Sequence, residues 1–164
     1  MTMAVISPSA ISGTLHVPAS KSMSQRALVL ALLHPGKTII QNAGHSEDVN
    51  AAINAVRQFG AQVSIMPSGD LKVISSGKAV PEEIIHCGES ALGARLFTAV
   101  AAMSGKKVII TGSGSLMNRP MDGFTNIFSS LGVSFEPTSG KMPIKVQGSY
   151  KVKNIEVDGS KGSQ

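Results

Sequence analysis

Hydroxyl groups and cations alternate in one short segment near the start of the chain. Residues 18–26 read PASKSMSQR and lie between a predicted strand at Thr14–Val17 and an apolar run that predicts a helix. The first turn of a helix offers unpaired backbone N–H groups and the positive end of the helix dipole. The segment adds three hydroxyl donors and two cations: Ser20, Ser22, Ser24, Lys21 and Arg26. This pattern predicts an anion-binding site.

Arg26 is the unusual residue of this segment, because the predicted helix continues from it through Ala, Leu and Val to Leu33. A guanidinium buried among such residues needs a carboxylate or phosphate partner, which favours the anion site. In the alternative interpretation, Ser20 is only a helix cap and the Arg26 side chain extends into solvent.

Further charged residues stand at other predicted helix starts. Arg95 occupies the position of Arg26 in a second, similar segment, and Glu89 is predicted to pair with it. Arg119, in Asn118–Pro120, is predicted to begin an amphipathic helix, since proline suits a first helical turn. Asp48 follows Ser46 at another helix start, where acidic residues are common, so we expect a structural role for it.

An internal repeat positions these residues. Arg26, Gly36 and Lys37 reappear 69 residues later as Arg95, Gly105 and Lys106. Each copy, about seventy residues long, reads β-α-β-α-β-β, and its first helix is apolar on all sides, which predicts burial. The resemblance of residues 157–164 to residues 17–25 predicts that a third copy begins at the end of the sequence. We therefore expect a fragment of a longer protein.

Composition excludes several classes of function. Of 164 residues, 42% are hydrophobic and only 15% are charged, which predicts a folded core and excludes intrinsic disorder. Cys87 is the only cysteine and the four histidines form no close pair, so neither a disulfide framework nor a metal site is expected. With six aromatic residues and scattered lysines, the chain has neither a stacking surface nor a basic stripe, so nucleic-acid binding is not expected. No apolar run is long enough for a membrane span, and we expect a soluble cytoplasmic protein.

Four motifs, in this order, resemble the N-terminal portion of the 5-enolpyruvylshikimate-3-phosphate synthase family: PASKSMSQRALVLALL, Ser46–Asp48, Asn118–Pro120 and Asp158–Gln164. The sister family, UDP-N-acetylglucosamine enolpyruvyl transferase, carries Lys-Asn where this chain has Lys21 and Ser22, and it is the closest alternative. A non-catalytic anion-binding module that reuses the repeat is the alternative from another class of function.

The resemblance implies an α/β (α+β) protein with the enolpyruvyl transferase fold. This fold is an inside-out α/β barrel of β-α-β-α-β-β units, three in each of two domains, with buried helices and outer sheets. Residues 1–17 would join the second domain, and residues 18–164 would form two repeats and the start of a third of the first domain. The complete enzyme would be a monomer, whereas the fragment would self-associate or fold only in part.

The resemblance also implies an activity and its residues. The family transfers the carboxyvinyl group of phosphoenolpyruvate to the 5-hydroxyl of shikimate 3-phosphate and releases phosphate, in the shikimate pathway of aromatic amino-acid biosynthesis, without metal or cofactor. Lys21 would be catalytic and touch both substrates, and Arg119 would bind phosphoenolpyruvate. The residues expected to hold shikimate 3-phosphate are Ser22, Arg26 and Ser163, with Gln164 between the two substrates.

This chain departs from the family pattern in three respects. Ala91 replaces a glycine beside the phosphoenolpyruvate site, and Gly162 replaces a serine of the phosphate site. The acid-base carboxylates of the second domain are not in the chain, so the fragment alone is expected to be inactive.

Overall fold

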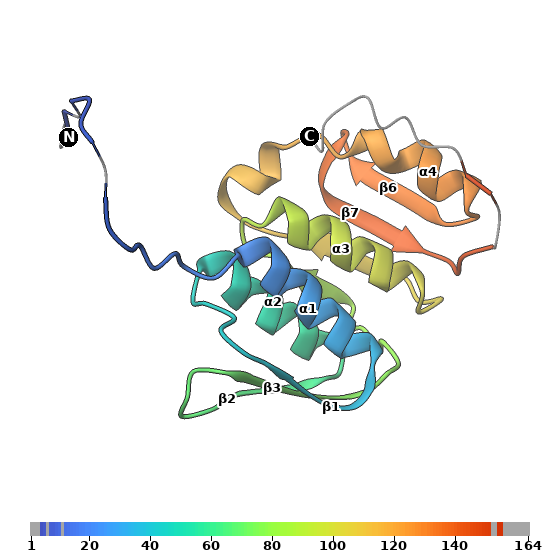
Figure 1. The fold of residues 1–164 in the computed structure, drawn as a ribbon. Helices are drawn as coiled ribbons and strands as arrows, with labels where there is room; N and C mark the ends of the chain where they lie inside the picture. The colour runs from blue at the N-terminus through green and yellow to red at the C-terminus, as the bar shows by residue number, and fades with distance from the viewer. Residues whose placement is uncertain (1–3, 6, 11, 152–153, 156–164) are drawn as a thin grey trace.

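The computed structural model describes residues 4–5, 7–10, 12–151 and 154–155 (Figure 1). Two similar units follow one another along the chain. The first unit consists of α1 (Lys21–Leu33), β1 (Pro35–Ile40), α2 (Glu47–Gln58), β2 (Gln62–Ile65) and β3 (Leu71–Ser76). The second consists of β4 (Ile84–His86), α3 (Ala91–Ala102), β5 (Val108–Thr111), the 3-10 turns η1 (Gly114–Asn118) and η2 (Asp122–Phe124), α4 (Thr125–Ser130), β6 (Ser134–Thr138) and β7 (Lys141–Gln147).

Each unit builds its own sheet. The first sheet has the order β1-β3-β2, and the second has the order β4-β5-β7-β6. The antiparallel order β5-β7-β6 of the second sheet repeats the antiparallel order β1-β3-β2 of the first. This correspondence confirms the internal repeat. Side chains alternate along β3, where Leu71, Val73 and Ser75 are buried and Ile74 is exposed. One face of the sheet therefore packs on helices while the other meets solvent.

One predicted strand is absent. β4 pairs in parallel with β5, but its counterpart in the first unit, Thr14–Val17, forms no strand, and Leu15 and Val17 are 84% and 76% exposed. A strand is stable only when its backbone groups find a partner. The described residues before α1 extend away from the body of the molecule, and one edge of β1 is unpaired (Figure 1).

Helices α1, α2 and α3 lie between the sheets, as predicted (Figure 1). α1 and α2 pack on the first sheet, α3 and α4 pack on the second, and α1, α2 and α3 contact one another. Phe59, which ends α2, and Phe97 of α3 are fully buried, with stacked rings 5.7 Å apart. This aromatic pair joins the cores of the two units. Closure of the layers into a barrel stays a prediction.

α1 is not buried on all sides, which corrects the sequence interpretation. Leu28 and Leu32 point into the core, but Met23 and Leu30 are 63% and 68% exposed. An apolar groove of about 290 Å³ also opens between α3 and α4. Among the described residues, no helix is long and apolar enough to cross a membrane. Self-association of the chain through these apolar surfaces stays a prediction.

Candidate functional site

Three helices begin at the same place in the molecule, and a serine caps each of them. The side-chain oxygens of Ser20, Ser46 and Ser90 accept hydrogen bonds from the backbone N–H groups three residues later, at 3.4, 3.3 and 3.0 Å. Each serine satisfies one N–H of the first turn, and the remaining N–H groups and the positive end of the dipole are directed out of the helix.

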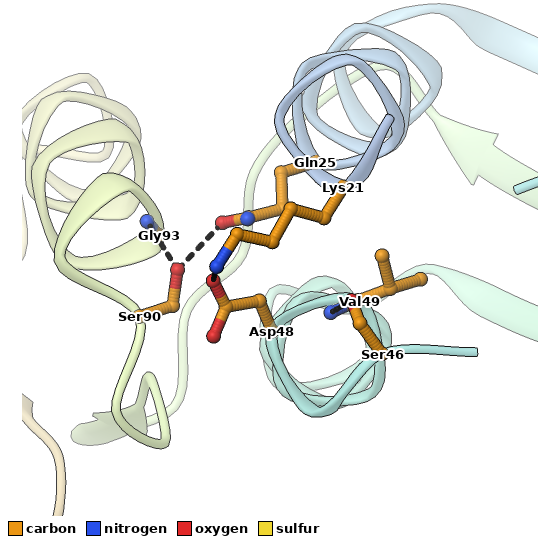
Figure 2. A network of polar contacts seen from close by, with 7 residues as sticks. All are labelled: Lys21, Gln25, Ser46, Asp48, Val49, Ser90 and Gly93. Carbon is orange, nitrogen blue, oxygen red and sulfur yellow. Dashed lines mark hydrogen bonds and ion pairs between the residues drawn. The ribbon is translucent and has the colours of Figure 1, made fainter. Parts of the chain in front are cut away.

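Two side-chain contacts tie these helix starts together (Figure 2). The Lys21 ammonium lies 2.8 Å from the Asp48 carboxylate and so joins α1 to α2. The Ser90 hydroxyl donates a hydrogen bond of 2.7 Å to the Gln25 side-chain carbonyl and so joins α1 to α3. The positive potentials of three helix N-termini therefore add together at this junction, which favours the binding of an anion there.

Lys21 lies at this junction, and its catalytic role stays a prediction. Its side chain is 60% exposed, and the side chain of Asp48 is 23% exposed. Besides the structural role expected for it at the start of α2, Asp48 thus contacts the predicted catalytic lysine directly. Because exposed ion pairs contribute little free energy, an incoming anion can compete for the ammonium.

The prediction that Arg26 is buried is wrong. Arg26 is exposed, and its guanidinium donates a 3.1 Å hydrogen bond to the backbone carbonyl of Ser22 on the same helix. The exposure of Arg26 agrees with the alternative interpretation in one respect, namely that its side chain extends into solvent. Arg26 lies one turn before the exposed Leu30, on the flank of α1 that faces away from the core.

Sequence reasoning missed the residue that is buried instead, Gln25. It is 1% exposed and lies three residues before Leu28 and seven before Leu32, on the core face of α1. That helical spacing is the signal by which it could have been found.

Glu89 lies beside the junction, just before α3. Its carboxylate accepts hydrogen bonds from the backbone N–H and the hydroxyl of Ser115, at 2.9 and 3.0 Å. These two bonds are the main cause of a lowered pKa for Glu89, and the charge of Arg119 lowers that pKa further. Ser115, and not the predicted Arg95, is thus the partner described for this carboxylate.

Arg95 and Arg119 bring further positive charge to the same region. Arg95 is partly buried, with its guanidinium carbon 5.5 Å from the centroid of the Phe124 ring. Burial lowers the pKa of Arg95, and the nearby charge of Arg119 contributes to the same shift. The electrostatic repulsion between Arg95 and Arg119 indicates that the two cations together raise the local positive potential.

The predicted setting of Arg119 needs correction. Arg119 is exposed and ends η1, and it does not begin a helix that runs through to Leu131. The segment after Pro120 forms the short turn η2, and α4 begins only at Thr125. Gly123 lies within that turn, and glycine is a poor helix former.

Ser163 and Gln164, the remaining predicted site residues, lie outside the described residues. Cys87 is 1% exposed, and burial raises the pKa of its thiol to about 12, so it is a neutral core residue. No group of three His, Cys, Asp or Glu side chains suited to a metal occurs in the described part of the chain.

A family model described as EPSP synthase (3-phosphoshikimate 1-carboxyvinyltransferase) matches residues 5–164. The chain belongs to this family. Among its EPSP synthase relatives, the 3-phosphoshikimate 1-carboxyvinyltransferase of Clostridium novyi is 32% identical over 97% of this chain and 39% of its own length. That of Thermococcus kodakarensis is 36% identical over 94% of this chain and 37% of its own length. The chain thus spans less than two fifths of the length of these relatives.

Solved structures share the fold of this EPSP synthase family member. The EPSP synthase from Acinetobacter baumannii matches 92% of this chain and 36% of its own, with a TM-score of 0.82 and 24% identity. The enolpyruvyl transferase NikO from Streptomyces tendae matches 84% of this chain and 30% of its own, with a TM-score of 0.57 and 13% identity. The predicted enolpyruvyl transferase fold is confirmed.

Proposed function

We propose that this chain is the N-terminal portion of a 3-phosphoshikimate 1-carboxyvinyltransferase and holds the anionic substrates of that enzyme. The observation that carries the proposal is the meeting of three capped helix starts around Lys21. Both substrates, phosphoenolpyruvate and shikimate 3-phosphate, carry several negative charges. Fixed dipoles and cations bind such molecules and keep them in register for reaction.

Each site residue has a defined part in the proposal. Lys21 touches both substrates once it leaves Asp48, and Ser22 and Arg26 hold shikimate 3-phosphate. Arg119 binds phosphoenolpyruvate. Of the two residues outside the described part, Ser163 binds the phosphate of shikimate 3-phosphate and Gln164 lies between the substrates.

The reaction proceeds in two stages. Protonation of the methylene carbon of phosphoenolpyruvate leaves a cationic carbon, to which the 5-hydroxyl oxygen adds with loss of its proton. The tetrahedral intermediate then loses phosphate and a methyl proton to restore the double bond. The groups that move these protons belong to a second domain, so the contribution of this chain is to bind and orient.

The proposed domain organisation is the one that the family resemblance implies. Residues 1–17 join the second domain, and residues 18–164 form two repeats and the start of a third of the first domain. The exposure of the apolar Leu15 and Val17 supports this, since such side chains are commonly covered by a partner surface. The complete enzyme is proposed to be a cytoplasmic monomer that needs no cofactor.

Titration calorimetry of the chain tests the proposed function. We expect shikimate 3-phosphate to bind, and shikimate, which lacks the phosphate, to bind at least tenfold more weakly, because charged hydrogen bonds to a phosphate contribute about 1.5–3 kcal/mol. Equal affinity for the two compounds, or no binding of either, would contradict the proposal.

The substitution Asp48→Asn is expected to strengthen the binding of shikimate 3-phosphate about twofold to fivefold. It removes the carboxylate that competes for the Lys21 ammonium, and an exposed ion pair contributes roughly 0.2–1 kcal/mol. Glu136→Gln on β6 is the matched control, because it makes the same change of charge on an exposed strand residue. Weaker binding by Asp48→Asn would show instead that Asp48 helps to bind the ligand.

A further inference from the structure

The side-chain amide of Gln25 is buried with only one of its two ends paired. Its carbonyl oxygen accepts the hydrogen bond from Ser90, whereas its Nε2 has no hydrogen-bond partner among the described residues. Gln25 is 1% exposed, so bulk solvent does not reach this amide. A buried donor without an acceptor costs free energy, and such groups in native proteins call for an explanation.

The start of α3 makes room for this amide. A Cβ atom at Gly93 would lie 3.3 Å from the Gln25 carbonyl oxygen and 3.1 Å from the Ser90 hydroxyl. Glycine inside a helix is itself unfavourable compared with alanine. Gln25, with its unpaired donor, and Gly93, inside a helix, are thus both locally unfavourable residues at this junction. Unfavourable features of this kind concentrate at functional sites.

The side chain of Lys21 is directed to the same junction of helix starts as that of Gln25 (Figure 2). It lies four residues before Gln25, one turn along the same face of α1, and Figure 2 shows both side chains directed from α1 towards the starts of α2 and α3. The Lys21 side chain reaches across to Asp48. An anion that drew the ammonium away from Asp48 would also move the stem of Lys21, which lies one turn from Gln25 on α1.

We propose that Gln25 is a further anion-binding residue, whose Nε2 donates a hydrogen bond to a phosphate oxygen that enters between the starts of α1 and α3. This proposal rests on the proposed function and adds a residue to its substrate site. A phosphate oxygen supplies the acceptor that the described residues lack. The helix dipoles and Lys21, one turn away on α1, favour a negatively charged acceptor over a neutral one.

The test measures the binding of inorganic phosphate to variants of two glutamines, Gln25 and Gln58. Gln25→Met keeps the length of the side chain and removes the donor. It also removes the acceptor of the Ser90 hydroxyl. We expect phosphate binding to weaken about tenfold in calorimetry while the thermal midpoint changes little, because the loss of an unpaired buried donor offsets the loss of the bond from Ser90. Unchanged affinity, or a wild-type chain that does not bind phosphate, would overturn the proposal.

Gln58→Met is the matched control. Gln58 bridges α2 and β4 with both ends of its amide paired, to the Ile84 carbonyl at 3.2 Å and the His86 N–H at 3.0 Å. This variant should lower the thermal midpoint and leave phosphate affinity unchanged. A lower midpoint with unchanged affinity in Gln25→Met as well would assign Gln25 a purely structural role.

Gln25→Glu covers the case in which Gln25→Met does not fold. It keeps an acceptor for Ser90 and replaces the donor with a carboxylate oxygen, so the folded variant should bind phosphate more than tenfold more weakly than wild type. Shikimate 3-phosphate separates the two proposals. If it binds no better than inorganic phosphate while both Gln25 variants still lose phosphate affinity, the proposed function fails and the assignment of Gln25 stands.

Discussion

Replacing Phe97 with alanine is expected to lower the free energy of unfolding by about 3–5 kcal/mol. Phe97 is fully buried in α3, and its ring stacks on that of Phe59 with centroids 5.7 Å apart. Because Phe59 belongs to the first unit and Phe97 to the second, the substitution leaves a cavity where the two units meet. Urea unfolding followed by circular dichroism measures the loss.

Phe124→Ala is the comparison for this prediction. Phe124 is only partly buried and lines the apolar groove between α3 and α4, where its removal leaves no closed cavity. We expect a loss of less than about 2 kcal/mol, since the surface it covers is already partly open to water. An equal loss in both variants would mean that the Phe59–Phe97 contact does not join the two units into one core.

Arg26→Ala is expected to weaken the binding of shikimate 3-phosphate by about 1.5–3 kcal/mol, or roughly tenfold to more than a hundredfold. The fold should be unaffected, because Arg26 is exposed and its described hydrogen bond goes to the carbonyl of Ser22 on its own helix. The guanidinium is therefore available to a ligand phosphate at little structural cost. Titration calorimetry and thermal unfolding of the same sample separate the two effects.

Arg57→Ala provides the control for Arg26→Ala. The Arg57 guanidinium donates to the Val63 carbonyl at 2.8 Å and to the Asn54 side chain at 3.3 Å, so it ties the end of α2 to β2. This variant should lose stability and keep its affinity for shikimate 3-phosphate. If Arg26→Ala shows the same pattern, the proposed contact between Arg26 and the substrate is wrong.

The ion pair between Lys21 and Asp48 gives the site a defined state before ligand binds. Asp48 holds the Lys21 ammonium 2.8 Å away, at the junction of the helix starts. The lysine is thereby kept at the junction where we propose that the substrates bind. Because the pair is partly exposed and weak, a multiply charged substrate can displace the carboxylate.

Much of this protein could be predicted from the sequence because the deciding interactions are local. Helix-start residues and apolar spacing act within a few residues of one another, and they predicted helices α1, α2 and α3. The recurrence of Arg26 as Arg95 revealed two copies of one unit. Repeated local patterns specify repeated local structure, so the order of elements followed directly.

Tertiary structure alone decided the features that depend on distant partners. Thr14–Val17 has the composition of a strand, yet it forms none, because a strand needs a neighbour to receive its hydrogen bonds. Gln25 and Arg26 are adjacent on α1; helical spacing places Gln25 on the core face, but only the packing of α3 brings the Ser90 hydroxyl to its amide. The junction of Lys21, Asp48 and Ser90 likewise joins three helices distant in sequence, and no local pattern encodes their meeting.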